Sequence, residues 1–141
     1  MATINANINI TNDVASGSVS ITQPMTLYKA GGTEGMDTMT SVSKVLTSTN
    51  QVDLITAASV STSHNYVYIS NPSTVSTEYF TVGIGDAGGG TPTETEEIGR
   101  LYGGPDGGDW MFIPWTAAAD EDIIVTPSVA TKMVVEYIVF S

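Results

Sequence analysis

The chain has 141 residues, a length that fits one compact domain, and its 15 acidic against 4 basic residues give a net charge of −11 at pH 7. With no cysteine and one histidine, His64, the sequence excludes disulfides, thiolate catalysis and zinc sites built from cysteine or paired histidines. The negative charge argues against nucleic acid and membranes as partners, because both present anionic surfaces.

Residues 1–40 predict an extended N-terminal β arm and a turn-rich connector, followed by a domain at 41–141. In the arm, Ile8 and Ile10 alternate with asparagine, which is the period of a strand with one polar face. Val19 and Ile21 alternate with serine in the same way, and the glycine-rich residues 29–37 then indicate turns. The arm has too few apolar residues to form its own core, so we expect it to add a strand to a neighbour.

Residues 41–141 predict short strands separated by segments rich in Gly, Pro, Ser and Asp. The clearest strand is 65–71, where Tyr66 and Tyr68 alternate with Val67 and Ile69. The full set is 41–48, 51–57, 65–71, 78–85, 108–115, 122–127 and 132–140. This regular spacing, without sustained helical periodicity, indicates an antiparallel β-sandwich or barrel.

The segment "GGDWMFIPWT", residues 107–116, is the most aromatic part of the chain. In a strand, Trp110 and Phe112 point to one face and Met111 and Ile113 to the other, so both faces are apolar. Pro114 should end the strand or lie at its edge. The core of the domain can cover only one of these apolar faces. The second face must be covered by the other sheet, a loop or another subunit. Core and subunit packing is favoured over a ligand platform.

The remaining polar motifs do not predict a catalytic, cofactor or metal site. The glycines of "GIGDAGGGTPTETEE" (83–97) precede glutamates and no helix, so a long hairpin loop is favoured over a phosphate-binding loop. Two acidic groups, Glu94, Glu96 and Glu97 and then Asp120, Glu121 and Asp122, could supply calcium ligands, but solvated acidic loops are the preferred interpretation. His64 precedes a strand, and no nucleophile accompanies it.

A pattern over residues 42–140 resembles the small β-sandwich virion proteins of tailed bacteriophages. It runs from Val52 and Leu54, through "YVYISNPS" (66–73) and "VGIG" (82–85), to "GDWMFIP" (108–114) and "VEY" (135–137). The resemblance covers about 100 residues. It implies an all-β, jelly-roll-like antiparallel β-sandwich and a structural place in the virion, as a capsid decoration (cement) protein, head fibre or tail component.

We therefore expect a non-enzymatic capsid decoration protein, made in the host cytoplasm and bound to the outer face of the phage head. Its expected partners are the major capsid protein and further copies of itself, as a homotrimer. The expected interface residues are Ile8, Ile10, Trp110, Phe112 and Trp115. The alternatives are a tail, adaptor or fibre component, or a carbohydrate-binding module in which Trp110, Trp115 and Tyr102 stack on sugars.

Overall fold

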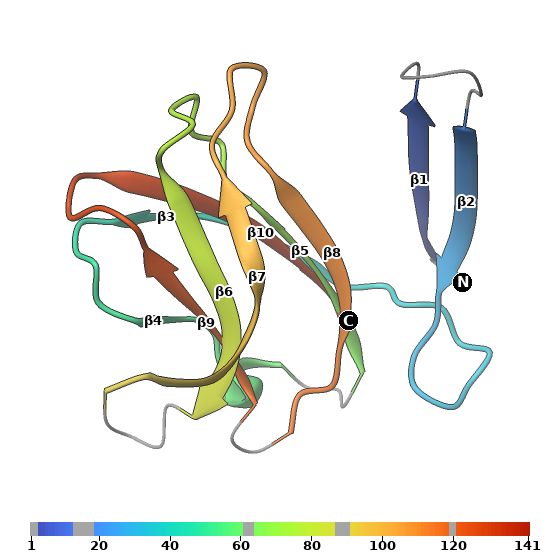
Figure 1. The fold of residues 1–141 in the computed structure, drawn as a ribbon. Helices are drawn as coiled ribbons and strands as arrows, with labels where there is room; N and C mark the ends of the chain where they lie inside the picture. The colour runs from blue at the N-terminus through green and yellow to red at the C-terminus, as the bar shows by residue number, and fades with distance from the viewer. Residues whose placement is uncertain (1–2, 13–18, 61–63, 87–90, 119–120) are drawn as a thin grey trace.

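The computed structural model of the chain describes residues 3–12, 19–60, 64–86, 91–118 and 121–141 (Figure 1). Two four-stranded antiparallel sheets pack face to face, and a separate two-stranded sheet precedes them in sequence. The predicted all-β class and antiparallel β-sandwich are therefore confirmed. In these ranges the 3-10 turn η1 (Ala57–Ser59) is the one helical element, and no helix is long and apolar enough to cross a membrane.

The sandwich draws each sheet from strands that are far apart in sequence. One sheet has the order β3-β10-β5-β8 and the other β4-β9-β6-β7. Every connection crosses from one sheet to the other except the hairpin that joins β6 to β7. The strands are β3 (Met39–Leu46), β4 (Val52–Ile55), β5 (Asn65–Ser70), β6 (Tyr79–Asp86), β7 (Thr93–Tyr102), β8 (Trp110–Trp115), β9 (Asp122–Pro127) and β10 (Met133–Phe140).

The core lies between the two sheets and is formed by every second side chain of the strands, because successive side chains of a strand point to opposite faces. Its fully buried members are Val67, Ile69, Phe80, Val82, Ile123, Val125 and Val135. Burying an aliphatic or phenyl side chain of this size contributes about 1.5–3 kcal/mol, so this layer supplies most of the stability of the sandwich.

The structure differs from the long loop predicted for residues 83–97, because strand β6 extends to Asp86 and strand β7 begins at Thr93. The glutamates Glu94, Glu96 and Glu97 lie along this strand and pair with β6. A strand can carry them because β7 is at the edge of its sheet and pairs with β6 alone. Gly83 makes room for this hairpin, since a Cβ atom there would lie 2.4 Å from the side chain of Glu94. Residues 87–90 of the predicted loop lie outside the described residues.

Strands β1 (Ile4–Asn12) and β2 (Val19–Leu27) form a hairpin beside the sandwich, on the side of β8 (Figure 1). Hereafter "the hairpin" refers to β1 and β2 only. These two strands occupy the segment that was predicted as an arm. One hairpin face is polar: Thr26 Oγ1 donates to Asn5 Oδ1 at 2.9 Å, and Thr22 Oγ1 donates to Asn9 Oδ1 at 3.4 Å. The other face carries a row of apolar side chains that is interrupted by Gln23. The facing pairs in this row are Ile4 and Leu27, Ala6 and Met25, Ile8 and Gln23, and Ile10 and Ile21.

Candidate interaction surface

The outer face of the sheet β3-β10-β5-β8 carries a cluster of aromatic rings. Tyr66 stacks on Phe112 with ring centroids 5.5 Å apart and planes at 12°. Tyr68 contacts Trp110 at 5.9 Å, and Phe112 contacts Phe140 of β10 at 6.1 Å. Tyr68 is directly opposite Phe112 in the register, so both β5–β8 ring pairs are diagonal neighbours, a spacing that aromatic side chains can bridge. The rings thus form one continuous surface.

The apolar row of the hairpin faces this aromatic cluster, and an open groove of about 280 Å³ lies between them. The hairpin side of the groove is formed by Ile4, Asn5, Ala6, Asn7, Ile8 and Leu27. The sheet side is formed by Tyr68, Trp110, Phe112 and Phe140. None of these side chains is charged, although the whole chain carries a net charge of −11. The groove is therefore an apolar and neutral region of a strongly acidic protein.

Burial of the apolar row falls along the hairpin. Leu27, at the end nearest the connector to β3, is fully buried. Ile8 is half-buried, and the far pair Ile10 and Ile21 is 53% and 50% exposed. On the sheet side of the groove, Trp110 is also 50% exposed. The sandwich therefore covers one end of the row and leaves the other end open to solvent.

A tight corner fixes the start of β8 and with it the position of Trp110. The buried Asn71 follows β5, and its backbone N–H donates to Asp109 O at 3.0 Å. Asp109 makes two hydrogen bonds with Tyr102 at the end of β7. The backbone N–H of Asp109 donates to Tyr102 O at 2.7 Å, and Asp109 Oδ2 accepts from Tyr102 N at 3.0 Å. A Cβ atom at Gly108 would lie 2.1 Å from Asn71 O, so the corner requires glycine there.

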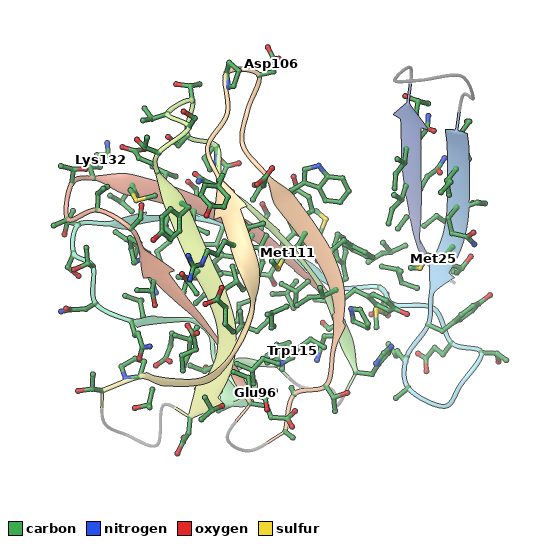
Figure 2. The ribbon with its side chains drawn as sticks, in the orientation of Figure 1. Met25, Glu96, Asp106, Met111, Trp115 and Lys132 are labelled. Carbon is green, nitrogen blue, oxygen red and sulfur yellow. The ribbon has the colours of Figure 1, made fainter. Side chains whose placement is uncertain are left out.

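Among the predicted interface residues, Ile8, Ile10, Trp110 and Phe112 belong to the hairpin row or the aromatic face, and Trp115 does not. Trp115 is 3% exposed, packs in the core and donates from Nε1 to Glu121 O at 2.9 Å. It lies with Met111 on the inner side of β8 (Figure 2). Strand β8 continues past Pro114 to Trp115, because β8 is an edge strand and tolerates a residue without an N–H.

The three aromatic residues considered for sugar stacking do not share one surface. Trp115 is buried, and Tyr102 lies on the other sheet, where it contacts Tyr79 at 5.0 Å. The Arg100 guanidinium lies 5.4 Å from the centre of the Tyr79 ring. Of the three residues, only Trp110 lies on the aromatic face described above. The structure therefore gives no combined platform of Trp110, Trp115 and Tyr102.

The acidic residues are spread over several strands. Burial raises the pKa of Asp53 and of Glu94, and neighbouring carboxylates raise both further. Asp122 Oδ1 accepts a hydrogen bond from the backbone of Ala57 at 2.6 Å. Among the described residues no three His, Cys, Asp or Glu side chains gather as a metal site, and Asp120 lies outside those residues. His64 makes an edge contact with Tyr66, with ring centroids 5.1 Å apart.

Comparison with known proteins adds no relative: no family model, curated protein sequence or solved structure matches this chain.

Proposed function

We propose that this chain is a non-enzymatic structural protein of a tailed-phage virion, a decoration protein that assembles as a homotrimer on the outer face of the head. The observation that carries the proposal is the strand order. Numbered from β3 as the first strand, the sheets have the orders 1-8-3-6 and 2-7-4-5. This order supports reading the sandwich as a jelly roll, an eight-stranded architecture that recurs in viral capsid proteins and lectins.

The charge supports a place on the outside of the shell. Packaged DNA repels a chain with a net charge of −11, so the inner face of a head is unfavourable for it. The apolar groove and the exposed end of the hairpin support a role in assembly, because large uncovered apolar surfaces on soluble proteins mark sites of association. A lectin-type role has less support, since the three candidate stacking residues are separated in the fold.

The test is binding of the purified chain to separated heads and tails of the phage that encodes it, measured by co-sedimentation and by electron cryo-microscopy. The proposal expects saturable binding to heads at lattice positions, with heads that resist heat or chelator better when the chain is bound. Binding to tails alone supports a tail, adaptor or fibre component instead. Binding to neither particle contradicts a role as a virion component.

A further inference from the structure

The hairpin presents an apolar end that its own sandwich does not cover. Ile10 and Ile21 face each other across the two strands on the apolar side and are both about half exposed. The same row continues along the groove, which Ile4 and Ile8 line, to the fully buried Leu27. The exposed end is therefore a continuation of the surface that lines the groove opposite the aromatic face of this chain.

The groove and the exposed end of the row complement each other. The groove offers carbon-rich walls, with Trp110 half exposed on the sheet side. The hairpin end offers two branched aliphatic side chains, Ile10 and Ile21, that are opposite each other and about half exposed. Within one chain the hairpin cannot use its own far end to fill the groove, since its near end already forms one wall.

Charge favours a second copy as the occupant. Two chains with a net charge of −11 repel each other over most of their surfaces. The described residues of β1 and β2 include no Asp, Glu, Lys or Arg, and the groove lining includes none either. These are therefore surfaces on which two copies can approach without bringing like charges together. The same net charge disfavours an anionic membrane or a nucleic acid as the occupant.

We propose that the far end of the hairpin of one copy, carrying Ile10 and Ile21, docks in the groove beside Trp110 of the next copy. The contact is heterologous, with a projection on one copy and a groove on the other, and a contact of this kind forms a ring when the rotation between copies closes. A trimer is the ring that the proposed function requires. The inference deepens that oligomeric part of the proposed function and is independent of attachment to a phage head.

The test uses two charge variants, Ile10→Lys and Trp110→Glu, the double variant that carries both substitutions, and the wild-type chain. Light scattering after gel filtration and sedimentation velocity, over a range of concentrations, measure the oligomer. Each substitution alone places a charge in an apolar contact, so each is expected to raise the dissociation constant at least about 30-fold, the effect of losing an interface hot spot. The double variant is expected to associate again, because the lysine of each copy then meets the glutamate of the next copy at every contact of the ring.

The controls carry the same charge changes at positions that the proposal leaves outside the contact. Thr11→Lys adds a lysine on the polar face of β1, next to Ile10 in sequence. Tyr102→Glu replaces an aromatic residue that is 42% exposed, like Trp110, but lies on the other sheet. Both are expected to keep the wild-type mass. All of these substitutions change exposed side chains, and far-UV circular dichroism with urea unfolding checks that each variant is folded.

Two results overturn the inference in different ways. If the wild-type chain is monomeric throughout, no second copy occupies the groove, and the homotrimer is also wrong, while head binding is judged by its own assay. If the wild type is oligomeric but both charge variants keep its mass, the copies meet through another surface. In that case the oligomeric part of the proposed function stands and the docking of the hairpin is wrong. A folded double variant that fails to reassociate equally contradicts contact between these two sites.

Discussion

Asn71 is the residue whose replacement most directly tests the corner that joins the two sheets. Its side chain makes three hydrogen bonds to backbone groups. Nδ2 donates to Leu101 O at 3.0 Å and to Glu78 O at 3.3 Å, and Oδ1 accepts from Ser73 N at 3.1 Å. The residue is 1% exposed, so water cannot readily replace these partners. We expect Asn71→Ala to weaken both the link between β5 and β7 and the start of β8.

The magnitude follows from the three lost bonds. A neutral hydrogen bond contributes a net of about 0.5–1.5 kcal/mol, and a buried group left unsatisfied costs about 1–3 kcal/mol. The bond to Leu101 O is buried, and the other two are partly buried and recover some hydration. The expected loss in free energy of unfolding is therefore about 2–4 kcal/mol. Asn71→Asp should do no better at neutral pH, because it removes both donors and sets a negative charge against two carbonyl oxygens.

Urea unfolding followed by tryptophan fluorescence measures this loss, because the buried Trp115 reports on the core. The matched control is Asn7→Ala, which changes an exposed asparagine on the polar face of the hairpin and should alter stability by less than about 0.5 kcal/mol. A loss below about 1 kcal/mol for Asn71→Ala, with an unchanged denaturant slope, would refute the reasoning that these bonds hold the corner together.

Three further substitutions test the core, the corner and the buried charge. Phe80→Ala, at the largest fully buried side chain, should cost about 3–5 kcal/mol in urea unfolding, and a cost under about 1 kcal/mol would contradict the core assignment. Gly108→Ala should destabilise by about 1–3 kcal/mol in thermal unfolding, because its Cβ would overlap Asn71 O, whereas Gly32→Ala, with no atom closer than 3.6 Å, should be nearly neutral. Asp53→Asn should stabilise the fold at pH 7, because burial raises the pKa of Asp53 and wild-type stability is lost as pH rises through that raised pKa. This advantage should vanish below the ordinary aspartate pKa of 3.8, and an advantage that persists in acid would show that the carboxylate charge is not its cause.

The strand pattern of the sandwich could be predicted from sequence where one face is buried. In β5 the alternation of Tyr66 and Tyr68 with Val67 and Ile69 predicts which side chains enter the core. The same alternation in β8 extends from Met111 through Ile113 to Trp115 and places Trp115 inside. Trp115 was nevertheless predicted as an interface residue, although the predicted strand 108–115 included it and Pro114 was expected to end the strand or to lie at its edge. The structure has the second arrangement, since β8 is an edge strand. Strand β7 was missed because its consecutive glutamates resemble a loop.

The candidate surface was only partly predictable. The doubly apolar segment at Trp110 and Phe112 indicates that a second cover is needed, but sequence alone does not say that the hairpin of the same chain provides part of it. That information depends on the order of the strands, which places β8 at the sheet edge beside the hairpin. The difference in exposure between Ile8 and Ile10 likewise depends on where the sandwich ends, which no local pattern encodes.

The Asn and Thr face of the hairpin has a consequence for the chain when it is cut or unfolded. Residues 4–12 read INANINITN, with alternating isoleucine and asparagine, no charge and no proline. Short uncharged segments of this kind, with asparagines that can form ladders along a stack, are the type that assembles into cross-β fibrils. In the folded protein the backbone of β2 pairs with one edge of β1 along its whole length. Proteolytic release of β1 from β2 would expose this edge, and we expect the freed segment to be the part of the chain most prone to amyloid-like aggregation.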